Sequence, residues 1–201
     1  ARWIGCDATF GMDRAFLEGL PPDRWYFAAV RSNLHILTDS PRWAVPERTG
    51  SRGKVPSKEK LTEAPRTVSE FVQTASFTPL VLKEGSRGPM GAFVHASRVF
   101  RAPATPEDPS RPEWLIVLKT PDGELRTALS NAPEDTPLDT FAHVSTLRWS
   151  IERCFEEGKS HLGMGHYEHR SYKGWHRHML YVFLAHHFLQ NIRGSLKKKL
   201  R

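Results

Sequence analysis

One segment of the sequence places an arginine, a glutamate and a lysine on a single helical stripe. Glu152 follows Arg148 by four residues and Lys159 follows Glu152 by seven, so at about 100° per residue all three project within about 40° of one another. A carboxylate between two cations suits metal-dependent phosphodiester chemistry, because hard oxygen ligands hold Mg²⁺ and cations bind phosphate. The same spacing also fits a salt-bridged amphipathic helix, and the residues leave both interpretations open.

The apolar residues of this helix predict where the charged stripe lies. They occupy one sector next to the stripe, at about 240–340° when Arg148 is taken as zero: Leu147, Ile151, Cys154, Phe155 and Leu162. We therefore expect the charged stripe to border a buried face. Arg153 and Glu157 project to the far side, where we expect ordinary solvated charges. Glu156 shares the stripe, and it either supports a ligand or is an ordinary acid of the helix surface.

This segment resembles the C-terminal signature of bacterial insertion-sequence transposases of the Asp-Asp-Glu type. The pattern of one subgroup is Tyr-x2-Arg-x3-Glu-x6-Lys, and Arg148, Glu152 and Lys159 fit its last three positions. Ser145 stands where the pattern has tyrosine, so the sequence departs from it there. The resemblance continues through residues 163–178 and also covers residues 129–133.

The resemblance implies an α/β fold with an RNase H-like catalytic core and a β-rich insertion before the helix that bears the glutamate. By motif and order, Asp7 matches the second catalytic acid and Glu152 the last one. The first acid belongs on a strand that should precede residue 1, so the first strands of the core are expected to be missing. Alone, such a chain should bind metal poorly and cut little. Alternatively, Asp7 only caps the helix that follows it.

The resemblance also implies a cofactor and DNA contacts. Two Mg²⁺ (or Mn²⁺) ions about 3.5–4 Å apart would activate a water and stabilise the leaving group in the complete enzyme, with Asp7 and Glu152 as ligands. Arg148 and Lys159 would contact phosphates, and the Ser145 hydroxyl could donate a shorter-reaching hydrogen bond. Further candidates for contact with the DNA backbone follow the signature, with ordinary surface residues as the alternative: Arg170, Lys173, Arg177 and His178.

The order of predicted elements agrees with this fold. In residues 1–37, a strand at 3–7, a helix at 11–20 and a strand at 25–30 predict a β-α-β unit with parallel strands, a partial core that carries Asp7. Residues 38–130 are predicted to form a long loop, up to about residue 67, and then the β-rich insertion. Predicted strands in it cover residues 71–77, 80–82, 92–100, 114–118 and 125–129. Residues 131–201 are predicted to hold the C-terminal helices of the core, at about 137–162 and 172–196.

Composition limits the class of protein. The 201 residues carry a formal net charge of +7, which favours a polyanionic partner. Basic residues gather in 42–66 and 197–201, although a solvated loop and a frayed helix end explain them equally well. No apolar run approaches the roughly 18 residues of a membrane span. The two cysteines, Cys6 and Cys154, are expected to be small buried residues, and we expect a bacterial cytoplasmic, nucleoid-associated protein.

Histidines and aromatic residues suggest further sites. Seven histidines lie in residues 161–187, but no cysteine pair or His-Glu-x-x-His motif accompanies them, which argues against structural zinc. Residues 166–170 are expected to pack the two C-terminal helices together and to contact the DNA backbone. An exposed aromatic residue could stack on an unpaired base; Trp43, Phe93 and Trp114 are the candidates, and each is more often a core residue.

The resemblance predicts a DNA transposase that cleaves the ends of an insertion sequence and transfers the freed strands. Its partners would be double-stranded DNA, both terminal inverted repeats and target DNA, and a second copy of the chain in a homodimer on paired ends. Two alternatives remain. One is an RNase H-like nuclease without strand transfer; the other is a catalytically inactive DNA-binding remnant, which the missing first acid and Ser145 favour.

Overall fold

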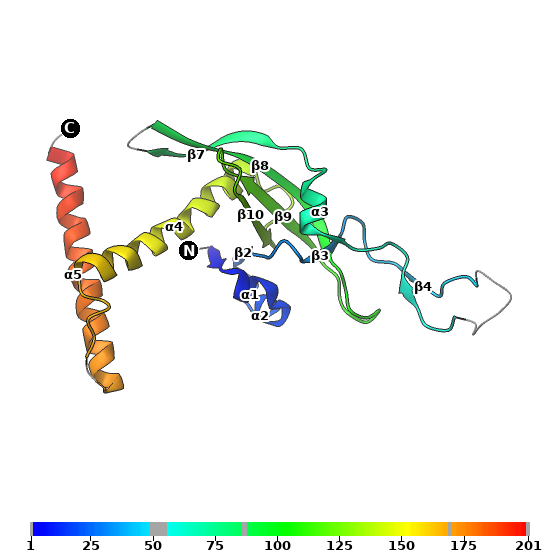
Figure 1. Cartoon of the computed structure of the whole chain (residues 1–201), viewed down its shortest axis with the longest axis horizontal. Helices are drawn as coiled ribbons and strands as arrows, with labels where there is room; N and C mark the ends of the chain where they lie inside the picture. Colours follow the sequence, from blue (N-terminus) through cyan, green and yellow to red (C-terminus); the bar gives the residue numbers. More distant parts are fainter. Residues whose placement is uncertain (1, 49–55, 86–87, 169, 200–201) are drawn as a thin grey trace. The chain divides into compact units, whose positions relative to one another are not determined.

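The chain forms a mixed α/β structure with a mainly sheet core and several helices (Figure 1). This computed structural model describes residues 2–48, 56–85, 88–168 and 170–199. The side chains of residues 83–85, 88–89, 148–150 and 197–199 are outside the description. The chain divides into two compact units, Ala1–Thr146 and Leu147–Arg201, which are described separately below.

Unit 1 begins with two parallel strands joined by short helices. Strand β1 (Trp3–Cys6) pairs with β2 (Trp25–Ala29), with Trp3 opposite Trp25, which confirms the predicted β-α-β unit. The single helix predicted at 11–20 is instead two, α1 (Ala8–Met12) and α2 (Arg14–Glu18). Asp13 separates them, because its backbone is extended and its side chain caps α2 by accepting from the Phe16 N–H at 3.0 Å.

The remaining strands of unit 1 extend the sheet that β1 and β2 begin. The order is β1-β2-β10-β9-β8-β3-β6, and β7 pairs with β8 off this path. β10 is antiparallel to both β2 and β9. The β-rich region is therefore continuous with the first strands in one mixed sheet. The added strands of this sheet are β3 (His35–Leu37), β6 (Arg66–Thr67), β7 (Thr78–Gly85), β8 (Gly88–Arg101), β9 (Pro112–Lys119) and β10 (Leu125–Ser130).

Four of the strands predicted in the β-rich region are confirmed, and one is wrong. Residues 71–77 do not form a strand, because helix α3 (Val68–Val72) occupies the start of this segment. A capping box begins the helix: the Glu70 N–H donates to Thr67 Oγ1 and the Thr67 N–H donates to Glu70 Oε2. The predicted loop before it contains a small separate hairpin, β4 (Trp43–Ala44) and β5 (Lys60–Leu61).

Two groups of buried residues form the core of unit 1. The first lies where β2, β9 and β10 meet α2 and α3, and it includes Tyr26, Ala28, Val68, Leu115 and Leu129. The second includes Val94, Ile116, Leu118 and Phe141, which comes from α4 (Leu138–His161). Helix α4 thus begins by packing on unit 1.

Unit 2 is a pair of helices, the last part of α4 and α5 (Tyr172–Lys199). Both helices were predicted within a few residues of these bounds. α4 ends where the Leu162 and Met164 N–H groups donate to the Gly158 carbonyl, and Gly163 follows with φ of 68°. A glycine suits this position because other residues rarely adopt a positive φ. Of the helices in the described ranges, none combines the length and apolar character that crossing a membrane requires.

Candidate functional site

Asp7 lies directly after β1, and its side chain caps α1. Its Oδ1 accepts from the Thr9 N–H at 2.9 Å and from the Phe10 N–H at 3.2 Å. The capping role that the sequence left open is therefore present. Both hydrogen bonds go to Oδ1, so Oδ2 takes no part in the cap. The side chain is exposed, and a carboxylate has about four acceptor sites; capping and ligand binding are compatible.

Gly11 fixes the helix that Asp7 caps against the sheet. The residue is buried, and a Cβ there would lie 1.9 Å from the Ala29 carbonyl oxygen of β2. Only a residue without a side chain permits this approach. The Gly11 N–H also donates to the Asp7 carbonyl at 2.8 Å. The direction of the Asp7 side chain is thus set by the packing of α1 on β2.

A buried ionic network holds the middle of the same sheet. Arg101 Nε donates to Glu113 Oε2 at 2.8 Å, and the Tyr26 hydroxyl donates to Glu113 Oε1. All three residues are less than 10% exposed. Burial, then the neighbouring Glu113 charge, raises the pKa of the Tyr26 phenol. The network joins β2, β8 and β9. The sequence does not reveal this network, because two charges and a phenol on three separate strands are recognisable as partners only when the register is known.

The signature residues on α4 have different environments. Glu152, Glu156 and Lys159 are exposed. The side chain of Arg148 lies outside the described residues. The Ser145 hydroxyl donates to the Ala142 carbonyl of its own helix at 2.7 Å, so it is already bonded within α4. Glu152 and Lys159 belong to unit 2, whereas Ser145 and Asp7 belong to unit 1.

The buried face predicted for this part of α4 is confirmed only in part, because Cys154 and Leu162 are half-buried. Leu147, Ile151 and Phe155 are instead 46%, 58% and 45% exposed, so three of the five apolar residues of this face are not buried. Within unit 2, α4 meets the rest of the unit through Glu157 and through part of the predicted apolar sector, which contains Cys154 and Gly158. Gly158 is buried, and a Cβ there would lie 2.8 Å from Met164 Cε. Glycine permits this close approach, and the contact sets which side of α4 is covered.

Glu157 was predicted to be a solvated charge, and this prediction is wrong. It is half-buried, and its Oε2 accepts from His186 Nε2 at 3.0 Å and from Gln190 Nε2 at 2.8 Å, both on α5. Its Oε1 accepts from Arg153 Nε at 2.9 Å. The hydrogen bond from Arg153, followed by that from His186, holds the pKa of Glu157 below its ordinary value. Helical periodicity could not find this residue, because its partners lie on a second helix.

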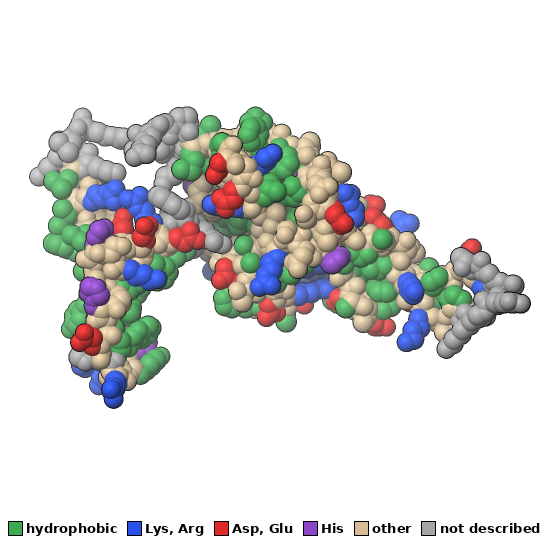
Figure 2. Space-filling model, viewed as in Figure 1, with side chains coloured by type: hydrophobic (Ala, Val, Ile, Leu, Met, Phe, Trp, Pro, Cys, Tyr) green, Lys and Arg blue, Asp and Glu red, His purple; other side chains and the backbone are tan. Residues whose placement is uncertain are grey.

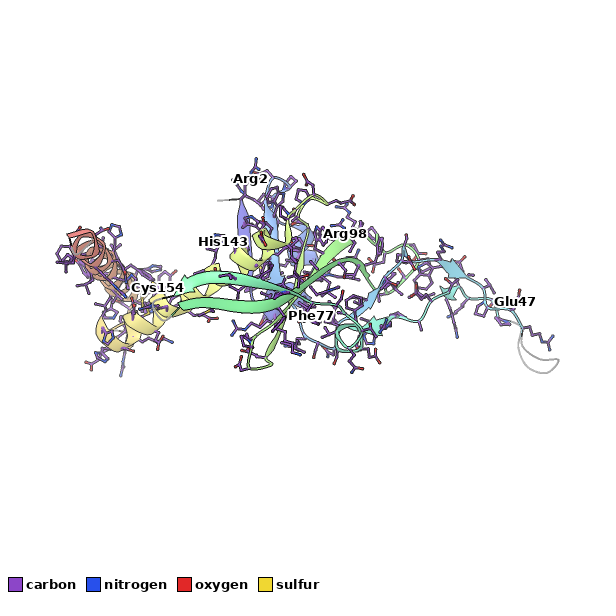
Figure 3. The ribbon with its side chains drawn as sticks, turned by 90° about the horizontal axis from the view of Figure 1, so that it is seen from above. Arg2, Glu47, Phe77, Arg98, His143 and Cys154 are labelled. Atoms are coloured by element: carbon purple, nitrogen blue, oxygen red, sulfur yellow. The ribbon has the colours of Figure 1, made fainter. Side chains whose placement is uncertain are left out.

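The Cys154 side chain points to the same junction between α4 and α5 (Figure 3). Its Sγ lies 3.8 Å from His186 Nδ1, and the residue is half-buried. Cys6, by contrast, is only 7% exposed, as predicted. Burial, then the charge of Asp7, raises the pKa of the Cys6 thiol.

The segment between the two helices is tied to α5 by His178. Its Nε2 donates to the Gly163 carbonyl at 3.0 Å, and its ring lies 5.7 Å from that of Tyr167. These contacts fit the predicted packing role of this segment.

Arg170, Lys173 and Arg177 are exposed. On the face of unit 1 in view, basic side chains lie beside acidic ones and form no continuous basic patch (Figure 2).

Of the three aromatic candidates for base stacking, Trp114 is half-buried and packs against the core. Its ring packs 5.4 Å from Phe141, and its Nε1 donates to the Pro133 carbonyl at 3.0 Å. The Arg98 guanidinium lies 5.3 Å from the same ring. Phe93 is 43% exposed, and Trp43 is half-buried in the β4–β5 hairpin.

The described ranges contain no group of three or more His, Cys, Asp or Glu side chains placed to hold a metal ion. Asp7 and Glu152 nevertheless have the donor chemistry that Mg²⁺ requires, because both are exposed residues that carry a carboxylate. Two carboxylates are fewer than a two-metal site needs, so further oxygen ligands are required.

No protein-family model matches the chain, and a search of curated proteins finds no match.

Proposed function

We propose that this chain is the C-terminal part of the catalytic domain of an insertion-sequence DNA transposase with an RNase H-like core. The spacing of Arg148, Glu152 and Lys159 carries the proposal. Two structural facts support it. All three residues lie on one continuous helix, α4, and Asp7 follows the C-terminal end of a strand in a parallel pair, where α/β sheets commonly place their sites.

The proposed roles follow from the chemistry of each side chain. Asp7 and Glu152 would each contribute carboxylate ligands to Mg²⁺ or Mn²⁺, which would supply an activated water and stabilise the leaving oxygen of a cut phosphodiester. The N–H groups of Thr9 and Phe10 hold Oδ1 of Asp7, so this carboxylate has a fixed direction before any ligand arrives. Lys159 presents a point charge to a DNA phosphate, and Arg148 presents a planar fork.

Other residues would contribute to DNA binding to different extents. Arg170, Lys173 and Arg177 are exposed cations that can pair with phosphates. His178 is a weaker member of this set, because its Nε2 is already bonded to Gly163. Ser145 is weaker still, because its hydroxyl donates to Ala142. The partners would be double-stranded terminal repeats and target DNA, with two copies of the chain on paired ends in a bacterial, nucleoid-associated setting.

The bonding of Ser145 favours a second function, that of an inactive DNA-binding remnant. A hydroxyl committed to its own helix cannot replace the longer-reaching tyrosine of the signature without breaking a hydrogen bond. In this case the chain would keep its exposed cations and bind DNA without cutting it.

A cutting and joining assay separates these functions. The full-length gene product is incubated with labelled ends of the element, with a target plasmid, and with Mg²⁺, Mn²⁺ or EDTA. A transposase gives metal-dependent nicks at the element ends and joined products. Cutting without joined products indicates a nuclease. Salt-sensitive binding without cutting in either metal indicates the remnant and overturns the proposal.

A further inference from the structure

Four donors converge on the carboxylate of Glu157 in unit 2. Arg153 Nε and Arg193 NH1 lie 2.9 and 3.7 Å from Oε1. His186 and Gln190 donate to Oε2. Three of these donors come from α5, at residues 186, 190 and 193, a spacing that places them on one face of that helix. The carboxylate of Glu157 on α4 is therefore the shared partner of three side chains on one face of α5.

The donors do not contribute equally. His186 and Gln190 lie within ordinary hydrogen-bond distance of Oε2, whereas Arg193 is farther away and about half exposed. A water molecule can replace a distant, exposed partner at little cost. Removal of Glu157 itself is different, because it takes the acceptor from all four donors at once, and the His186 side chain is only 18% exposed.

Glu157 lies between two residues of the signature, so its contacts with α5 also affect the direction of those two side chains. It follows Glu152 by five residues and precedes Lys159 by two. The neighbouring Gly158 allows the close contact with Met164. A rotation of α4 by one residue, about 100°, would carry Glu157 away from α5. The same rotation would redirect Glu152 and Lys159, since all three belong to one helix.

We propose that Glu157 is a positioning residue, which holds α4 in one rotation against α5 and so directs Glu152 and Lys159. The proposal rests on the proposed function, because a positioning role presupposes that Glu152 acts in the site. Glu157 itself touches neither DNA nor metal in this account. Glu156→Gln is the matched control, since it removes the same charge from the adjacent, exposed position.

The first readout needs no activity. Amide hydrogen exchange is measured in the last two turns of α4 in the 201-residue chain. Glu157→Gln should speed exchange there about tenfold or more, while Glu156→Gln and Arg193→Gln should stay within about threefold of the parent. Glu157→Gln combined with His186→Ala should exchange no faster than Glu157→Gln alone, because the two changes break the same contact. Parent-like exchange in Glu157→Gln overturns the proposal.

The second readout is metal-dependent cutting by the full-length gene product, in single-turnover reactions at saturating DNA. Glu157→Gln should lower the rate about tenfold or more and raise the Kd for DNA by less than about threefold. Added Mn²⁺ should partly restore this rate, but should not restore that of Glu152→Gln. If exchange rises in Glu157→Gln while cutting stays parent-like, Glu157 only stabilises the helix pair and the positioning role is wrong. If Glu152→Gln cuts like the parent, the proposed function fails instead, and the exchange result still decides whether Glu157 holds α4.

Discussion

Replacing Gly11 with alanine should destabilise unit 1, although alanine is the better helix former. Gly11 lies in α1 and faces the backbone of β2. An added Cβ would meet the Ala29 carbonyl oxygen at 1.9 Å and its carbon at 2.9 Å. Neither atom belongs to a flexible side chain, so the helix and the strand must move apart. Gly5→Ala is the control, because a Cβ at residue 5 meets nothing within 4 Å.

The distance from the added Cβ to the Ala29 carbonyl oxygen gives the size of the destabilisation. Restoring an ordinary contact of about 3.4 Å requires a separation of about 1.5 Å between α1 and β2. Overpacking costs about 1–3 kcal/mol, and a clash with backbone belongs at the upper end. Against this, alanine gains about 1 kcal/mol of helix propensity. The net loss for Gly11→Ala is therefore about 2 kcal/mol, or about 4–8 °C in Tm for a chain of this size. Gly5→Ala should instead gain about 0.5–1 kcal/mol, as an alanine does in a strand.

Thermal unfolding followed by circular dichroism measures both variants against the parent. The two substitutions add the same methyl group, so the opposite signs can come only from the surroundings of the two glycines. A Gly11→Ala protein as stable as Gly5→Ala would refute the close packing of α1 on β2. It would also remove the reason for a fixed direction of Asp7.

Three further predictions concern charged residues. Asp7→Asn keeps an acceptor for the α1 cap, so stability in urea should stay within about 0.5 kcal/mol of the parent, while cutting by the full-length gene product should be lost; cutting at the parent rate would show that Asp7 is only a cap. Glu113→Gln should cost about 3–5 kcal/mol of unfolding free energy, because it leaves the buried Arg101 charge uncompensated; a loss below about 1 kcal/mol in the same titration would mean that the network is not formed. The pKa of Glu157 is lower in the folded chain, so its contribution to stability is present above the ordinary glutamate pKa of about 4.3 and is lost as the pH falls through the lowered folded value. Helix content measured against pH should therefore fall less steeply in this acid range for Glu157→Gln than for the parent, and superimposable curves would argue against the contact with α5.

Local sequence patterns predicted most of the elements. The short apolar segments that became β1 and β2 are each closed by turn or capping residues, and their parallel pairing follows from the helices between them. The failure at residues 71–77 has a local cause. Phe71 and Val72 are typical strand residues, but the capping box between Thr67 and Glu70 starts a helix just before them. The Thr-x-x-Glu signal was present in the sequence and was overlooked.

The candidate site was predicted less completely, because its contacts cross between elements. Asp7 was correctly placed at the end of a strand, and both of its possible roles were foreseen. The roles of Glu157 and Glu113 depend on His186 and Arg101, which lie on other elements. Periodicity on one helix indicates which residues share a side, but it does not indicate which side the next helix covers. For this reason the prediction for α4 missed the contacts of Glu157 with α5.

The most direct test of the central claim is the effect of Glu152→Gln on cutting by the full-length gene product in Mn²⁺, compared with Glu156→Gln. Both substitutions remove one charge from an exposed position of the same helix. The proposed function predicts that Glu152→Gln abolishes cutting and leaves the Kd for DNA within about threefold of the parent, since a metal ligand is lost and no phosphate contact is. It predicts parent-like cutting for Glu156→Gln. Equal cutting by the two variants would contradict the assignment of Glu152 as the catalytic acid, and with it the transposase site proposed for this chain.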